Sequence, residues 1–126
     1  MRNSGSVSIT IIARDYKWIQ TLEKINVRVP LPKAVKSRGD IICDLQQCHL
    51  QIGVKGQPLI IDGFLEFDAN EEESSWALED KRSTVVLTFE KLDKTHYWYH
   101  LIETDPDAIT KEVYFYNIIL YIINNC

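Results

Sequence analysis

The sequence predicts an all-β fold, an antiparallel β-sandwich of seven to eight strands, and two observations support this prediction. Apolar and polar residues alternate with a period of two in several short runs between residues 15 and 90, the pattern of strands with one buried face and one solvated face. Turn-forming residues separate these runs at the spacing that a sandwich needs. One domain of this kind accounts for most of the 126 residues.

The strands are predicted from the alternation itself. In the run 24–29, polar residues alternate with Ile25, Val27 and Val29, so these three side chains are expected to face inward. The same alternation recurs further along the chain, in the runs 41–45, 50–54 and 85–89.

Turn and loop signals stand between the runs. Lys55-Gly56 is expected to be a glycine turn, and Asp62-Gly63 is either a hairpin turn or a bulge within a strand. The acidic run 71–73 is expected to form a solvated loop before a strand that carries Trp76. A helix is expected only near the end, where Asp105-Pro106-Asp107 combines a capping aspartate with proline at the first helical position.

The net charge of −4 conceals an uneven distribution along the chain. Residues 1–60 contain nine Lys or Arg against four Asp or Glu, which gives +5, and residues 61–126 contain five against fourteen, which gives −9. The acidic total and the lack of aromatic residues interleaved with basic ones argue against a nucleic acid partner. The longest apolar run, 113–123, is too short to span a bilayer, so no membrane partner is predicted.

Cysteine usage predicts a cytoplasmic location. Cys43, Cys48 and Cys126 cannot all pair within one chain, and no secretory leader opens the sequence. Cys43 belongs to an inward-facing alternation, and with Cys48 and His49 it lacks a fourth ligand nearby, so these residues do not predict a metal site.

The three tryptophans carry different expectations. Trp76 shares a strand face with Leu78 and is expected in the core. Trp18 and Trp98 lie at predicted strand ends, and the sequence leaves open whether each is buried or exposes one edge to a partner.

No catalytic constellation is recognisable, so the chain is predicted not to be an enzyme and to need no cofactor. A nucleophile elbow, a phosphate loop and a dinucleotide fingerprint are all lacking from the sequence. The alternative is a small metal-dependent enzyme using His96, His100 and Glu103, because the two histidines are four residues apart, a helical ligand spacing. Five basic residues are interpreted first as a solvated face, and the alternative is that they contact an acidic surface of a partner protein. These residues are Lys24, Arg28, Lys33, Lys36 and Arg38.

Several motifs together resemble one family. They are Tyr16 to Leu22, the Lys55-Gly56-Gln57-Pro58 turn continuing through Ile60-Ile61-Asp62-Gly63, Glu73-Ser74-Ser75-Trp76 through Glu79-Asp80, Glu90-Lys91, Trp98 and Asp105-Pro106. In this order and spacing they resemble the CS domain of the nuclear distribution (nuclear migration) protein NudC family. The resemblance extends from about residue 15 to residue 111, which we take as the CS domain.

The resemblance implies a sandwich like that of small heat-shock proteins and a non-enzymatic chaperone or cochaperone function. The implied partners are heat-shock protein 90, unfolded client proteins and regulators of the dynein pathway. Related CS domains dock through one sheet face and edge, and on this basis we expect the following residues at a protein-binding surface: Tyr16, Trp18, Gln20, Lys24, Arg28, Lys55, Lys91 and Trp98.

Two departures from the family define the remaining segments. Full-length members place a helical, dimer-forming segment before the CS domain, whereas here only residues 1–14 precede it, so we expect a fragment with a short N-terminal extension. Residues 112–126 form an atypical apolar tail without the polar, helix-forming sequence of the family. This tail is either a mis-read gene boundary or an added strand, and if exposed it would favour weak self-association.

Overall fold

The computed structural model describes residues 8–105, 119–120 and 122–123. Within residues 8–105 the chain forms two antiparallel sheets, which confirms the predicted sandwich of seven to eight strands. The elements are β1 (Ile9–Ile12), β2 (Lys17–Gln20), β3 (Lys24–Pro30), the short 3-10 helix η1 (Arg38–Asp40), β4 (Ile41–Leu45), β5 (His49–Val54), β6 (Ile61–Phe64), β7 (Ala69–Glu79) and β8 (Thr84–Lys91).

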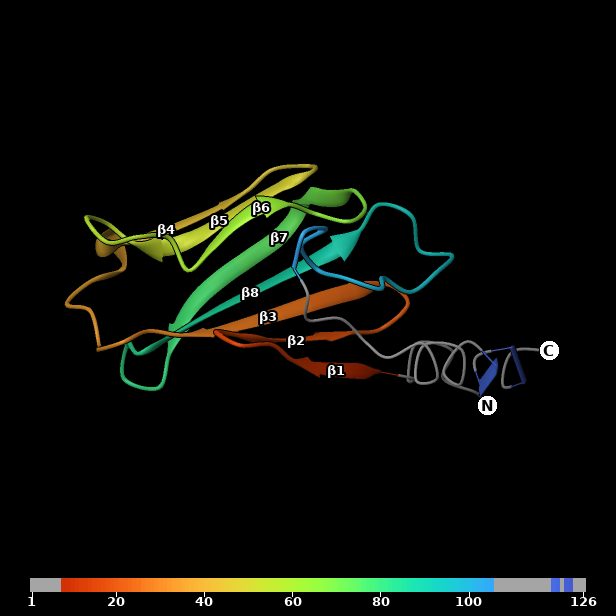
Figure 1. Cartoon of the computed structure of the whole chain (residues 1–126), viewed down its shortest axis with the longest axis horizontal. Coiled ribbons are helices and arrows are strands. Elements are labelled where there is room, and N and C mark those ends of the chain that lie inside the picture. The colour runs from red at the N-terminus through yellow and green to blue at the C-terminus, as the bar shows by residue number, and fades with distance from the viewer. Residues whose placement is uncertain (1–7, 106–118, 121, 124–126) are drawn as a thin grey trace.

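The two sheets form the layers of the sandwich. The larger sheet has the strand order β1-β2-β3-β8-β7, and the smaller has the order β4-β5-β6. In Figure 1 the smaller sheet lies over the larger one. β1 falls within the expected N-terminal extension, yet it pairs along its length with β2, for example Ile11 with Trp18, and so forms an edge strand of the sandwich.

The core lies between the inner faces of the sheets. The register places Trp18, Val27 and Leu87 side by side on three neighbouring strands, and each is at most 2% exposed. Leu50 and Ile52 of β5 contribute from the smaller sheet and are 0% exposed. Burial of each such side chain stabilises the fold by about 1.5–3 kcal/mol, so the predicted alternation directly produces the core.

The tryptophans lie at different depths. Trp18 and Trp98 are both 0% exposed, so the alternative in which one of them exposes an edge is wrong. Trp76 lies on the inner face of β7 and packs against the core as predicted, but it is only half-buried because β7 is an edge strand. The Arg38 guanidinium lies 3.5 Å from the centroid of its ring, a cation–π contact that covers part of the exposed ring.

The glycine turn is confirmed, whereas two other local predictions are wrong. Gly56 has a φ of +82°, and the Gln57 N–H donates to the Val54 carbonyl at 3.0 Å. The acidic run 71–73 belongs to β7, where a register shift against β8 replaces the expected loop. Asp62-Gly63 is neither a turn nor a bulge but a regularly paired part of β6.

The C-terminal predictions fall largely outside the described residues. The expected helix beyond Asp105 begins at residue 106, where the description ends, and Cys126 also lies outside it. In the apolar tail, residues 119–120 and 122–123 have helical backbone, so the alternative of an added strand is wrong at these positions. Among the described residues, no helix has the length and apolar character needed to cross a membrane.

Candidate protein-binding groove

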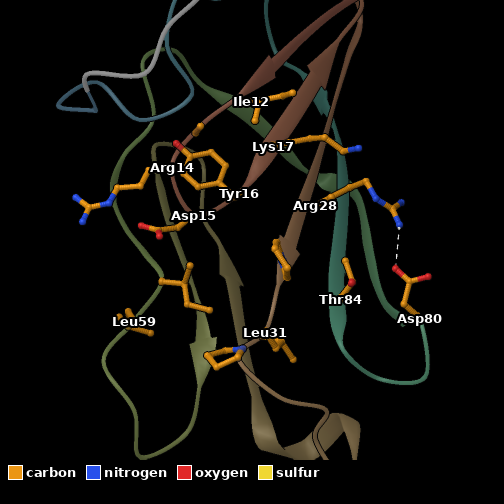
Figure 2. A pocket seen from close by; sticks show the side chains of 14 residues that line it. Ile12, Arg14, Asp15, Tyr16, Lys17, Arg28, Leu31, Leu59, Asp80 and Thr84 are labelled. Carbon is orange, nitrogen blue, oxygen red and sulfur yellow. Dashed lines mark ion pairs between the residues drawn. The ribbon is translucent and has the colours of Figure 1, made fainter.

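An open groove of about 710 Å³ lies at one end of the sandwich, where the turn between β1 and β2 approaches the end of β3. Figure 2 shows Leu59 on one side of this groove and Arg28 with Asp80 on the other. We call it the end groove. Its lining residues are Ile12, Ala13, Arg14, Asp15, Tyr16, Lys17, Arg28, Pro30, Leu31, Pro32, Leu59, Ile60, Asp80 and Thr84.

The β1–β2 turn forms one wall of the end groove. Its conformation is fixed by the Ala13 N–H, which donates to the Tyr16 carbonyl at 2.8 Å. The Tyr16 ring is 7% exposed, and its hydroxyl donates to the Asp105 carboxylate, which ties the turn to the segment that follows β8. Ile12 stands beside the turn with 80% of its surface exposed. A large apolar side chain on a fixed turn is a ready contact for a partner.

The floor of the end groove is apolar. Leu31 follows the last residue of β3, is 8% exposed, and donates its backbone N–H to the Ser83 carbonyl at 2.8 Å. Leu59 and Ile60 precede β6 and are half-buried. Their position depends on Gly53 of β5, because a Cβ added there would lie 3.0 Å from Leu59 Cδ2 and 3.1 Å from its Cα.

Charged groups surround this floor, and one side is ion-paired. Arg28 Nη2 lies 3.0 Å from Glu79 Oε1 and 3.7 Å from Asp80 Oδ2. These side chains are 30–65% exposed, so the pairs contribute little to stability. They do hold Arg28 on the side of the groove away from Leu59 (Figure 2).

A buried polar network lies inside the sandwich, at the ends of β2 and β8 that point away from the end groove. Gln20 of β2 is 0% exposed; its Nε2 donates to the Trp98 carbonyl at 2.6 Å, and its Oε1 accepts from the Trp98 N–H at 2.8 Å. Lys91 is also 0% exposed, and its Nζ donates to Gln20 Oε1 at 2.8 Å and to the His96 carbonyl at 3.3 Å. These bonds fasten the segment after β8 onto the larger sheet.

The Lys91 ammonium is buried among neutral acceptors. Loss of hydration without a carboxylate partner lowers its pKa from 10.5 to about 7. The Tyr97 ring centroid lies 5.1 Å from Nζ and is the one aromatic face recorded near it among the described residues. Lys91 is therefore a structural hydrogen-bond donor whose protonation costs free energy, and it is inaccessible to a partner.

The segment after β8 also covers the edge of β6. Leu65 and Ile102 form an antiparallel bridge, and a Cβ added to Gly63 would lie 2.6 Å from Ile102 Cγ2. The Glu66 carboxylate then accepts two successive backbone N–H groups, those of Tyr99 at 2.6 Å and His100 at 2.7 Å. This strap, residues 96–103, satisfies backbone groups that an open sheet edge would leave to solvent or to other chains.

The histidines do not assemble the alternative metal site. Residues 96–103 are not helical, so the four-residue spacing does not bring His96, His100 and Glu103 onto one face. His100 Nδ1 lies 3.4 Å from Glu66 Oε2, and His96 Nδ1 lies 3.6 Å from Asp93 Oδ2. The described part of the chain contains no group of three or more His, Cys, Asp or Glu that could hold a metal ion.

The thiol of Cys43 is likewise suited to packing rather than to chemistry. Cys43 and Cys48 are both free cysteines. Burial raises the pKa of the Cys43 thiol to about 12, an effect that outweighs the opposing influence of Arg38. Its thiolate is therefore not populated at neutral pH.

The structure divides the eight residues predicted at a protein-binding surface into separate groups. Tyr16 and Arg28 line the end groove, and Lys24 and Lys55 are exposed elsewhere. For these four, contact with a partner stays a prediction. The other four are 0% exposed and hold the sandwich together, so they are not surface contacts: Trp18, Gln20, Lys91 and Trp98.

Sequence reasoning missed the residues that shape the groove floor and the strap. Leu59 and Ile60 give a weak signal, because they begin a run of three adjacent apolar residues that follows Pro58 without alternation. Glu66 gives no local signal, because the N–H groups that it accepts lie 33 and 34 residues away.

Comparisons with known proteins identify relatives of this chain. The CS domain family matches residues 14–91. The nuclear migration protein nudC of Drosophila melanogaster is 37% identical over 79% of this chain and 30% of its own length. The NudC domain-containing protein 2 of Homo sapiens is 34% identical over 73% of this chain and 58% of its own length. These matches confirm the resemblance on which the sequence-based expectations rest.

Solved structures confirm the fold. The CS domain of the human KIAA1068 protein superposes with a TM-score of 0.69 at 22% identity, covering 81% of this chain and 83% of that one. The nuclear movement protein from E. cuniculi gives a TM-score of 0.59 at 21% identity, covering 71% and 99%. The chain spans about a third of the length of the first curated relatives, 30% of the Drosophila protein and 33% of the Arabidopsis protein BOBBER 2.

Proposed function

The chain belongs to the CS domain family, and we propose that it is a non-enzymatic, cochaperone-type protein-binding domain of a NudC-like nuclear migration protein. Its proposed partners are unfolded clients, heat-shock protein 90 or regulators of the dynein pathway, and its proposed location is the cytoplasm. The Drosophila melanogaster relative is a nuclear migration protein by name, and the role of this chain in nuclear migration is part of the proposal. Self-association through the apolar tail stays a prediction.

The observation that supports the proposal is the contrast between the interior and the end groove. Inside the sandwich, the polar side chains of Gln20 and Lys91 are engaged in hydrogen bonds that fasten the strap. At the end groove, an apolar floor is open to solvent beside Ile12, which is 80% exposed. A rigid scaffold with an apolar groove at its surface is suited to holding another polypeptide without changing it chemically.

Titration of the 15N-labelled domain with heat-shock protein 90, with and without nucleotide, tests the proposal for the larger chaperone. Suppression of aggregation of a heat-labile client enzyme tests the proposal for clients. We expect chemical-shift changes in at least one titration and slower client aggregation at stoichiometric amounts of domain. The absence of both effects at high protein concentration would contradict the proposal.

A pair of variants locates the contact. Ile12→Asp places a charge on the rim of the end groove, whereas Leu92→Asp places one at a 55% exposed position that does not line it. If the groove is the contact, the first substitution weakens client protection or chaperone binding and the matched control does not. An equal loss of client protection or chaperone binding in both variants would show that the contact does not lie at the end groove.

A further inference from the structure

A second groove adjoins the end groove and differs from it in charge. The two share Pro32 and Ile60, and the second has a volume of about 600 Å³. Its walls come from the loop between β3 and η1 and from the turn between β5 and β6. We call it the lysine groove, because its lining includes Lys33, Lys36 and Lys55.

Backbone hydrogen bonds hold both walls of the lysine groove in place. In the first wall, the Val35 N–H donates to the Arg82 carbonyl at 3.0 Å, and Arg82 Nε donates back to the Val35 carbonyl at 3.0 Å. In the second wall, the Lys55 N–H donates to the Asp40 carbonyl at 2.9 Å, and the turn continues through Gly56 with its φ of +82°. The backbones that carry the lysines are therefore positioned before any partner arrives.

The lysine groove is positive on a protein that is negative overall. Its lining contains three lysines against one acidic residue, Asp40, whose carboxylate accepts the Ser37 N–H at 3.2 Å. The Lys and Arg ion pairs recorded within residues 8–105 involve Arg28 and Lys94, and none involves a lysine of this groove. All three lysines are exposed, so their ammonium groups are free to meet carboxylates.

The floor of the lysine groove is apolar. Val35, Val54 and Ile60 are half-buried, and prolines at positions 32 and 58 complete the lining. Among the described residues, no aromatic side chain lines it, so these residues offer no stacking surface for nucleobases. An apolar floor beneath separate point charges instead matches a polypeptide with apolar and acidic side chains.

We propose that the lysine groove binds an extended acidic peptide segment, whose apolar side chains pack on Val35, Val54 and Ile60 and whose carboxylates meet the three lysines. This inference rests on the proposed protein-binding function and specifies the chemistry of the segment. Charge complementarity steers such a segment to the groove and selects against basic ones, while the apolar contacts provide burial.

The test uses a labelled twelve-residue peptide in which leucine alternates with glutamate or aspartate. Two comparison peptides replace the acidic residues with lysine or the leucines with serine. We expect the acidic-apolar peptide to shift the amide resonances of residues 33–36 and 54–60 of the 15N-labelled chain, and the comparison peptides to bind at least about tenfold more weakly. Raising the salt concentration should weaken the binding, because exposed charges are screened.

Matched charge reversals separate local contact from net charge. Lys36→Glu/Lys55→Glu and the control Lys81→Glu/Lys94→Glu change the net charge equally, but only the first pair lines the groove. We expect roughly tenfold weaker peptide binding for the first variant and less than about twofold for the control. Circular dichroism of both variants verifies that they fold.

The outcomes distinguish this inference from the proposed function. Loss of peptide binding in the control to the same degree, or no shifts at about 1 mM peptide, would overturn the inference. A duplex oligonucleotide or a phosphatidylserine vesicle that shifts the same resonances more strongly than the peptide would also overturn it. If client protection persists in these cases, the proposed function stands without the lysine groove; if client protection and chaperone binding are also absent, both fail.

Discussion

Replacement of Lys91 by methionine should abolish a specific pH dependence of stability. The Lys91 ammonium is 0% exposed and is bound by the neutral oxygens of Gln20 and His96. Methionine has a similar length, and Gln20 Oε1 keeps its second donor, the Trp98 N–H at 2.8 Å. The substitution therefore removes a buried charge and leaves most of the network intact.

The magnitude follows from proton linkage. A folded-state pKa of about 7 against an ordinary value of 10.5 means that the unfolded chain binds more protons between these two pH values, so stability rises with pH in this window. The full difference corresponds to roughly 5 kcal/mol as an upper limit, and the part between pH 7 and pH 9 to about 2 kcal/mol. Below pH 7 both states are protonated, and the cost of the buried charge is constant.

Urea unfolding followed by tryptophan fluorescence at pH 6, 7, 8 and 9 measures this effect. The wild-type free energy of unfolding should rise relative to that of Lys91→Met by about 2 kcal/mol between pH 7 and pH 9. The Cys43 thiol, whose pKa is raised to about 12, opposes the rise in both proteins and cancels in the difference. Lys24→Met, at an exposed position, is the control and should follow the wild type. A difference that stays constant with pH would refute the reasoning.

Three further substitutions test the strap and the edge strand by the same unfolding assay. Glu66→Ala leaves two backbone N–H groups without the carboxylate that accepts them and should cost about 2–3 kcal/mol, whereas Glu66→Gln should recover part of it. Gly63→Ala places a Cβ 2.6 Å from Ile102 Cγ2 and should cost about 1–3 kcal/mol; in an Ile102→Ala background, which lacks Cγ2, the same substitution should cost less, and an undiminished cost would show that this contact is not its cause. Arg38→Ala removes a cation 3.5 Å from the Trp76 ring and a hydrogen bond to its carbonyl; it should cost about 1 kcal/mol and increase acrylamide quenching of Trp76, and unchanged quenching would contradict the contact.

The alternation of residues predicted the sheets because it depends on each strand alone. Ile25, Val27 and Val29 face inward as expected, since a period of two places every second side chain on the same face. The same period also places Gln20 and Lys91 inward, because Gln20 lies two residues after Trp18 and Lys91 lies two residues after Phe89. The family resemblance nevertheless led us to expect both at a protein-binding surface. Their burial depends on partners that are distant in sequence, since the bond between Gln20 and Lys91 spans 71 residues and the bond between Gln20 and Trp98 spans 78.

The grooves were not predictable for a related reason. Lys36 and Lys55 lie on different sheet connections, and only the packing of the connections brings them to one groove. Gly63 gave a turn signal by its residue type, yet its function is to admit Ile102 from the strap. Local patterns thus determine which residues form strands, whereas the surface depends on contacts between distant segments.

The uneven charge along the chain becomes an uneven charge in space. The basic first half supplies the lysine groove, whereas the acidic second half supplies the exposed run 71–73 on β7. Arg28 of the basic half is paired with Glu79 and Asp80 of the acidic half. An acidic segment is therefore attracted to the lysine groove and repelled from β7, so the field of the protein orients the encounter before contact. Because this field is screened over about 8 Å at physiological ionic strength, it guides only the final approach, and the affinity must come from contacts within the groove, both the apolar floor and the lysine–carboxylate pairs.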